Sequence, residues 1–407
     1  AFITAANRWE AVIATPITIV LDVDFGPTFF GQAYGDPHIL GQTGTSSSIG
    51  PYPDLRQRLI NGASTPAETQ LYNALPATQV PTEQDGGVVT NVTNARVARP
   101  NARALGIVPD ISNPGSIPLG QGDAEIGFNS AFPFDFNPDD GITSNQTDFD
   151  SVATHEIGHA LGFVSNSGGI NAGTIVAIWD LFRFRPAAAT LATFATAPRV
   201  MSVGGSQVYF TNQLNTFATL ELDLSTGGPN PSAGVGDGRQ SSHWRDDDLV
   251  STAQYIGIMD PTLDDGVRRT LSENDLKALD MFGYTLGGPP IARPPNDNFA
   301  DAINLPGNSG SVNGTNVNAT REVGEQIHVG LLGDKSIWYT WQSTINGQAT
   351  FDTIGSSFDT TLAVYIGTAV NQLVNVTQND DITAGQNRAS RVQFGVSAGT
   401  TYRIVID

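Results

Sequence analysis

The chain has 407 residues, of which 39% are hydrophobic, which fits roughly two or three domains with their own apolar cores and excludes a disordered protein. It carries 20 basic and 40 acidic residues, and the net charge of −20 argues against binding to nucleic acid or to an anionic membrane surface. No cysteine is present, so disulfides and thiolate metal sites are excluded. No run approaches about 18 consecutive apolar residues, so we expect no membrane span.

The first elements follow one another closely. In chain order we predict a helix at residues 5–13, a strand at 17–25, a loop rich in Gly, Ser and Thr at 26–50, and short helices at 53–61 and 66–74. Asp22 and Asp24 are expected on the solvated side of the strand, and His38 is interpreted as a surface residue of the loop. Because Ala1 opens directly into helical sequence without a signal-peptide pattern, we expect the chain to be a processed form.

Residues 123–129 alternate in polarity and precede the loop that leads into the histidine motif described next. We predict an edge strand there. Such a strand beside a catalytic helix would let an extended peptide add its own backbone hydrogen bonds to the sheet.

The most informative stretch is residues 152–163, which contain His155-Glu156-x-x-His159 and then Gly162. On a helix, residues four apart share a face, so both imidazoles can reach one metal ion while Glu156 leans toward its open side. Imidazole is a good zinc ligand, and a carboxylate beside zinc-bound water can act as a general base. The pattern therefore predicts a zinc hydrolase centre, with Gly162 ending the helix at positive φ.

A catalytic zinc site needs a third protein ligand, and the imidazole candidates are His38, His243 and His328. His328 falls in a predicted second domain. His243 follows a Gly/Ala/Thr-rich region, residues 164–240, in which we predict a helix or strand near residues 175–182 and a strand at 207–210.

Met259 lies in an apolar run closed by a turn signal, where its side chain could pack beneath the metal ligands or simply fill the core. Residues 271–284 predict a helix, with Ser272 as N-cap, Asp275 three residues later and Gly283 at the end. Residues 287–295 contain two proline pairs and predict a linker. Short β-runs follow at residues 336–341, 349–353, 362–366, 392–396 and 401–406, which predict a β-sandwich.

In this order, residues 155–163, Ser242-His243-Trp244 and Met259-Asp-Pro resemble the leishmanolysin-like branch of the metzincin zinc peptidases. The compact metzincin pattern would place its third ligand at position 165, which is serine here. The resemblance implies that His155, His159 and His243 bind zinc, that Glu156 is the general base and that Met259 is the Met-turn residue. It also implies an α+β metzincin-like catalytic domain at residues 1–286, with a long insertion at 164–240.

Residues 296–407 resemble the bacterial pre-peptidase C-terminal domain, a jelly-roll-like all-β sandwich, through Asn296-Asp-Asn-Phe, residues 355–360 and residues 379–381. Related modules often bind calcium. The resemblance therefore implies Ca²⁺ as a second ion and makes Asp297 and Asp381 its candidate ligands, while solvated turn carboxylates are the plainer interpretation of both residues.

We predict a secreted, extracellular zinc endopeptidase of bacterial type that acts on protein or peptide substrates. The low share of charged residues, 15%, and the abundance of Gly, Asn, Thr and Ser are typical of such proteins. The alternative is a structural or adhesive surface or filament protein that retains a peptidase-derived fold. In that case the C-terminal sandwich would bind a surface polymer or mediate self-assembly. The complete His-Glu-His set favours the enzyme.

Overall fold

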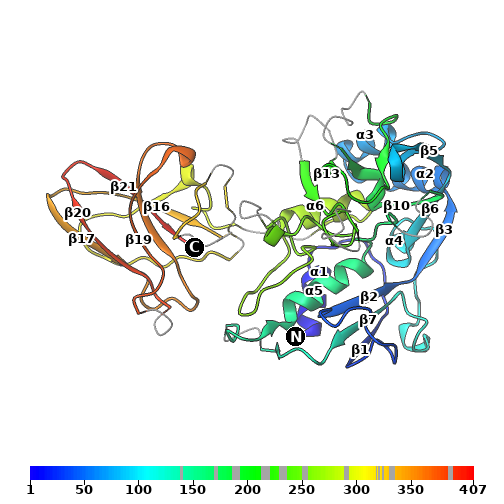
Figure 1. The fold of residues 1–407 in the computed structure, drawn as a ribbon, viewed down its shortest axis with the longest axis horizontal. Helices are drawn as coiled ribbons and strands as arrows, with labels where there is room; N and C mark the ends of the chain where they lie inside the picture. Colours follow the sequence, from blue (N-terminus) through cyan, green and yellow to red (C-terminus); the bar gives the residue numbers. More distant parts are fainter. Residues whose placement is uncertain are drawn as a thin grey trace. The chain divides into compact units, whose positions relative to one another are not determined.

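The computed structural model of the chain divides into two compact units, Ala1–Pro289 and Pro290–Asp407 (Figure 1). The division falls inside the predicted linker at 287–295, of which residues 288–292 are outside the described part. The described residues are 1–137, 141–168, 173–185, 193–211, 221–228, 236–249, 255–287, 293–317, 319, 321–322, 325–329, 335–383 and 388–407. Among them, no helix has the length and apolar character that crossing a membrane requires.

The first unit is mixed α/β and is built from helices around several small sheets. Its helices are α1 (Phe2–Glu10), α2 (Tyr52–Gly62), α3 (Pro66–Ala74), α4 (Arg99–Ala104), α5 (Phe149–Ala160) and α6 (Glu273–Met281). The helices predicted at 5–13, 53–61, 66–74 and 271–284 correspond to α1, α2, α3 and α6. Both α3 and α6 begin at a capping box, in which the N-cap hydroxyl and the carboxylate three residues later satisfy each other's backbone N–H groups.

The sheet that borders the histidine motif has the order β1 (Leu21–Gly26), β7 (Ala124–Asn129) and β2 (Gly41–Thr45), with β1 parallel and β2 antiparallel to β7. The prediction of an edge strand at 123–129 is therefore wrong, because β7 is the central strand. The edge beside α5 is β2, which lies in the stretch predicted as loop. Asp22 is also buried, since its carboxylate accepts the N–H groups of Gly120 and Gly122.

The described residues of the first unit form three further three-stranded sheets. They are β10 (Ile175–Ala177), β6 (Asn94–Ala98) and β3 (Ser47–Pro51); β12 (Arg199–Val200), β4 (Val80–Glu83) and β5 (Val89–Val92); and β11 (Arg183–Phe184), β13 (Val208–Thr211) and β14 (Glu221–Leu224). A short parallel pair, β8 (Phe134–Asp135) and β9 (Thr147–Asp148), precedes α5. The predicted insertion 164–240 thus adds strands to sheets that earlier segments begin.

Helix α5 is held in the centre of the first unit, and most of its residues are buried. Asp148 caps its N-terminus by accepting the Ser151 N–H. At the other end Gly162 has φ +115, as its predicted role as helix terminator requires. Helix α1 packs along α5, and the Trp9 indole N–H donates to the Thr154 carbonyl at 2.9 Å. The motif helix is therefore fixed along its length by other elements.

The second unit is β-rich. Its larger sheet has the order β15 (Ile303–Asn304), β16 (Ile337–Gln342), β21 (Thr401–Ile406), β18 (Leu362–Ile366) and β19 (Val374–Asn379), and β17 (Gly347–Asp352) pairs with β20 (Arg391–Val396). Each β-run predicted after residue 335 corresponds to one of these strands, whereas β15 and β19 were not predicted. Trp338 and Trp341 are buried, so they pack in the core of this unit.

Candidate metal centre

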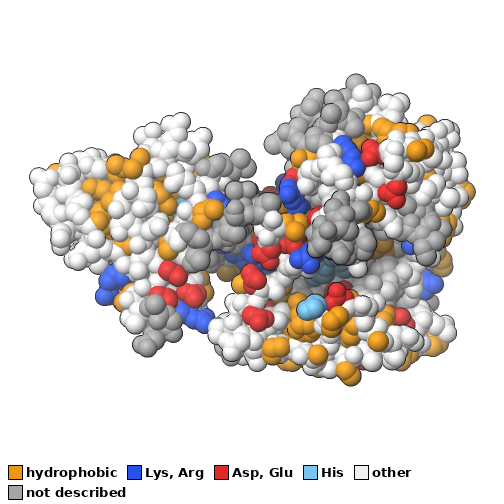
Figure 2. All heavy atoms as spheres, in the orientation of Figure 1, with side chains coloured by type: hydrophobic (Ala, Val, Ile, Leu, Met, Phe, Trp, Pro, Cys, Tyr) orange, Lys and Arg blue, Asp and Glu red, His pale blue; other side chains and the backbone are white. Residues whose placement is uncertain are grey.

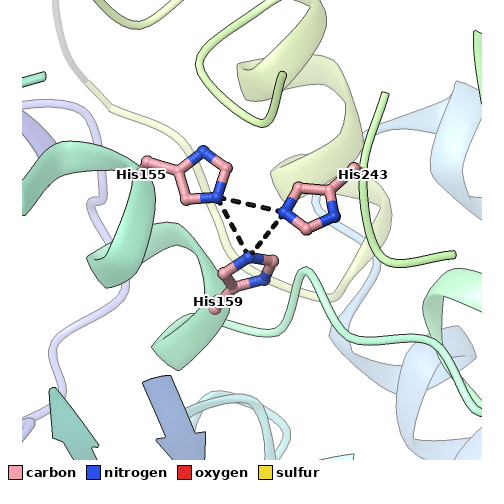
Figure 3. Close-up of side chains that lie close together, drawn as sticks. All are labelled: His155, His159 and His243. Carbon is pink, nitrogen blue, oxygen red and sulfur yellow. Dashed lines mark hydrogen bonds between the residues drawn. The ribbon is translucent and has the colours of Figure 1, made fainter. Parts of the chain in front are cut away.

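Three histidines that lie far apart in the sequence meet in the first unit (Figure 3). His155 and His159 project from one face of α5, and His243 approaches from a segment that begins after residue 235. Their Nε2 atoms form a triangle in which each pair is 3.1 Å apart. The structure therefore brings together the two motif histidines and the third candidate ligand.

Backbone carbonyls fix the tautomer of all three rings. Nδ1 of His155 lies 2.7 Å from the Ile258 carbonyl oxygen, and Nδ1 of His159 lies 2.7 Å from that of Phe163. Nδ1 of His243 lies 3.1 Å from the Gln240 carbonyl oxygen. A carbonyl oxygen can only accept, so each neutral ring carries its proton on Nδ1. Its Nε2 then presents a lone pair. Three lone pairs that converge without a donor among them repel one another, and a bound cation would remove that repulsion.

The triangle fits zinc. Its centre lies about 1.8 Å from each nitrogen, close to the zinc–nitrogen distance of about 2.0–2.1 Å, so His155, His159 and His243 could hold one ion together. Three protein ligands is also the number typical of catalytic zinc sites. An all-imidazole set also suits other divalent transition metals.

Burial keeps the three imidazoles neutral. It lowers the pKa of His155 to about 3 and that of His159 to about 4, and it lowers the pKa of His243 as well. The neighbouring imidazoles contribute to the shift in His155 and His243, because a second positive charge would repel the first. Neutral imidazole is the form that binds metal, so the environment favours ligation at ordinary pH.

Glu156 lies on the same helix and is 5% exposed. Burial raises its pKa to about 7, and a hydrogen bond from Thr43 opposes that shift. The Thr43 hydroxyl lies 2.6 Å from Glu156 Oε2 and so orients the carboxyl group. A group with this pKa can both accept and return a proton near neutral pH.

Gly41 and Thr43 belong to β2 and were missed by the sequence analysis. A Cβ at Gly41 would lie 2.8 Å from Glu156 Oε1 and 2.9 Å from its Cγ, closer than real Cβ contacts allow. The strand therefore approaches Glu156 so closely that a larger residue at position 41 would displace the Glu156 side chain. The Gly/Ser/Thr-rich composition of residues 26–50 hid this strand, although a glycine within a strand often marks such a close approach.

Met259 packs against the helix that carries the motif. It is fully buried, and a Cβ on Gly158, the residue before His159, would lie 2.4 Å from its sulfur. The Met259 carbonyl accepts the N–H of Trp244, the residue after His243, at 3.0 Å. The turn thus contacts both the helix and the third-ligand segment.

The insertion anchors the third-ligand segment through Ser241. The Ser241 carbonyl accepts hydrogen bonds from Arg183 Nη1 at 2.8 Å and from the Trp179 indole at 3.1 Å. Both donors are fully buried. Burial lowers the pKa of Arg183 to about 10, while nearby Asp180 favours its charged form. This anchoring has no local sequence signature, because Arg183 and Trp179 lie 58 and 62 residues before Ser241.

The histidines open onto a cleft of about 1220 Å³ that is lined by residues of the first unit, including β2, Tyr255 and residues 260–265. Figure 2 shows this face, with acidic side chains gathered near the hollow. His38 lies on the cleft wall, 90% of its side chain exposed, and pairs with Asp36 rather than joining the three histidines. Trp244 is fully buried, so it cannot contact a substrate.

The two calcium candidates do not come together. Asp297 is buried and pairs with Arg293 at 3.1 Å, and among the described residues it belongs to no group of converging metal-binding side chains. Asp381 lies with Asp359 and Asp380, whose carboxylate oxygens fall within 4.8 Å of one another. His328 is buried in the second unit between Glu325 and Tyr365, each 2.8 Å away.

Comparison with protein-family models, with curated proteins and with solved structures finds no match to this chain.

Proposed function

We propose that the chain is a zinc-dependent endopeptidase whose metal ligands are His155, His159 and His243. The observation that carries the proposal is the convergence of three Nε2 atoms, which line one open cleft together with the buried carboxylate of Glu156. Zinc bound there would polarise a substrate carbonyl and lower the pKa of a water molecule to about 7.

Glu156 supplies the proton transfers. The Thr43 hydroxyl engages Oε2, which leaves Oε1 to take a proton from the attacking water. The same oxygen can then hand the proton to the leaving amine, so that water adds across the peptide bond and no net proton is consumed. The pKa of about 7 suits both steps near neutral pH.

Strand β2 offers the backbone edge along which an extended peptide can align. Asn129 donates its N–H to the Leu40 carbonyl at 2.9 Å, and hydrogen-bonded positions in an antiparallel pair recur at every second residue. The backbone groups of Gly41 and Thr43 therefore point away from β7, toward the outer edge. A peptide paired there would lie beside Glu156.

The resemblance to leishmanolysin-like metzincins supports the same activity, with residues 1–286 as the catalytic domain. By the second resemblance, residues 296–407 form a jelly-roll-like sandwich that accompanies a secreted peptidase. In the described part of that unit, the group of Asp359, Asp380 and Asp381 offers oxygen ligands for Ca²⁺, whereas Asp297 pairs with Arg293.

The test is removal and return of the metal. Dialysis against a strong chelator is expected to lower hydrolysis of casein by more than about 100-fold, because the loss of metal stabilisation costs several kcal/mol. One equivalent of zinc is expected to restore it. Undiminished hydrolysis by the metal-free chain would refute the proposal. Zinc binding without hydrolysis under any condition would favour the structural or adhesive alternative.

Gly41 gives a second test that leaves the ligands untouched. Gly41→Ala is expected to displace Glu156 and lower kcat/KM by about 10²-fold, the usual effect of misplacing a catalytic group by about 1 Å. Zinc content should stay at that of the wild type. Gly50→Ala is the matched control, since a Cβ there meets nothing within 4 Å. Equal activity of the two variants would contradict the role given to this close approach.

A further inference from the structure

One buried carboxylate connects two of the three histidines. Asp275, the third residue of α6, is 0% exposed. Within the capping box, its Oδ2 accepts hydrogen bonds from the Ser272 N–H and the Ser272 hydroxyl, each at 2.8 Å. Two other N–H groups also donate to it, and both come from segments that carry the metal centre.

The first of these segments holds His243. The indole N–H of Trp244 donates to Asp275 Oδ1 at 2.8 Å. Trp244 directly follows the third ligand and is fully buried, and it packs against Trp179 with ring centroids 5.0 Å apart. Because Asp275 fixes the position of the Trp244 side chain, it also restrains the position of His243, the preceding residue.

The second segment supports His155. The Ile258 N–H donates to Asp275 Oδ2 at 2.8 Å, and the Ile258 carbonyl accepts Nδ1 of His155 at 2.7 Å. The same peptide segment thus receives the carboxylate on one side and the imidazole on the other. Because the carbonyl keeps the His155 proton on Nδ1, this contact also leaves Nε2 free for metal.

The surrounding chain is shaped to admit the carboxylate. A Cβ at Gly257 would lie 2.4 Å from Asp275 Oδ1 and 2.5 Å from Oδ2, so the backbone at that position passes directly over the group. Burial raises the pKa of Asp275, and the hydrogen bonds from Trp244, Ser272 and Ile258 oppose that shift. A buried carboxylate costs free energy unless such donors satisfy it.

We propose that Asp275 is a positioning residue for the metal centre: it joins the third-ligand segment to the Met259 turn, and so sets the spacing between His155 and His243. This inference rests on the proposed function, because it assigns Asp275 a role toward zinc. It extends that function to a residue that touches neither metal nor substrate.

The experiment compares zinc dissociation constants of the full chain, measured by competition with a chromogenic chelator. Asp275→Asn replaces one acceptor oxygen by an amide nitrogen, so at least one of the links to Trp244 and Ile258 is lost. We expect zinc affinity to fall by about 10- to 100-fold, the usual effect of removing a group that orients metal ligands. Circular dichroism and thermal melting of the metal-free proteins establish that the wild type and Asp275→Asn are both folded.

Glu68→Gln is the matched control. Among the described residues, Glu68 is the other buried carboxylate that completes a capping box, in α3. It bonds to Ser64 and Thr65 and interacts with Asp280 of α6, and none of these residues belongs to a segment that carries a metal ligand. We expect this variant to lose thermal stability without a change in zinc affinity. An affinity loss that is equal in both variants would mean that Asp275 acts only through stability, and it would overturn the proposal.

The outcomes separate this inference from the proposed function. A wild-type chain that binds no zinc would refute the function itself. A wild-type chain that binds zinc, with unchanged affinity in folded Asp275→Asn, would refute the role of Asp275 alone. If Asp275→Asn does not fold, Trp244→Phe removes one link and keeps the carboxylate. Unchanged zinc affinity in that variant would equally overturn the proposal, and weakened affinity would support it.

Discussion

Replacing His243 by alanine is expected to remove tight zinc binding and, with it, peptide hydrolysis. Two imidazoles would remain on α5, but the triangle of Nε2 atoms would lose one corner. Changes to groups that merely orient metal ligands weaken binding by about 10- to 100-fold, so the loss of a ligand should exceed about 100-fold. Metal content by mass spectrometry and zinc affinity by chelator competition measure the effect.

His38→Ala is the control for this variant, because it removes an imidazole that is exposed on the cleft wall and pairs with Asp36. It should retain about one zinc per chain, the stoichiometry of a single catalytic site. Full zinc occupancy in His243→Ala would eliminate His243 as the third ligand. A loss of zinc in His38→Ala instead would move the ligand role to the loop before β2.

Glu156→Gln is expected to separate chemistry from metal binding. The amide keeps the size of the side chain and can still accept from the Thr43 hydroxyl, but it cannot take a proton from water. We expect kcat/KM for a peptide substrate to fall by about 10²- to 10⁴-fold, the usual contribution of general acid–base catalysis. Steady-state kinetics with equal zinc content in both proteins measures it.

The comparison with Gly41→Ala sharpens this result. Both variants should keep zinc, yet in Gly41→Ala the carboxylate is displaced rather than removed. A displaced carboxylate still titrates, so residual activity in that variant should retain its dependence on pH, whereas the activity left in Glu156→Gln should not show that ionisation. Wild-type kcat/KM in Glu156→Gln would refute the general-base role.

Local patterns predicted the parts of the centre that lie on one element. The spacing of His155 and His159 follows from helical periodicity, and Gly162 and Ser272 mark helix ends through their own backbone or side-chain chemistry. Strands β16, β17, β18, β20 and β21 of the second unit were equally visible as short β-rich runs, whereas β15 and β19 were not predicted. In each of these cases the deciding interactions lie within a few residues of one another.

The parts that join distant segments were not predictable in the same way. The sequence predicts a loop at β2 because Gly41, Gly44 and the Gly/Ser/Thr-rich stretch around them outweigh the strand propensity of its two threonines, and the pairing with β7 is not visible in the local pattern. The role of His243 came from a family resemblance, since it lies 84 residues after His159. The grouping of Asp359 with Asp380 and Asp381 also joins separate segments and was not predicted.

The distance along the chain between His155 and His243 has a consequence for the stability of the folded chain. The two residues are 88 positions apart, and a metal bound by both would close that length of chain into a loop. A covalent cross-link over such a loop restricts the unfolded chain by about 4–5 kcal/mol in the chain-entropy relation. Because the protein has no cysteine, a bound metal ion would take the place of a disulfide as a cross-link. Loss of the metal would then lower the stability of the fold and expose the chain to cleavage by other copies of the enzyme that still hold their metal.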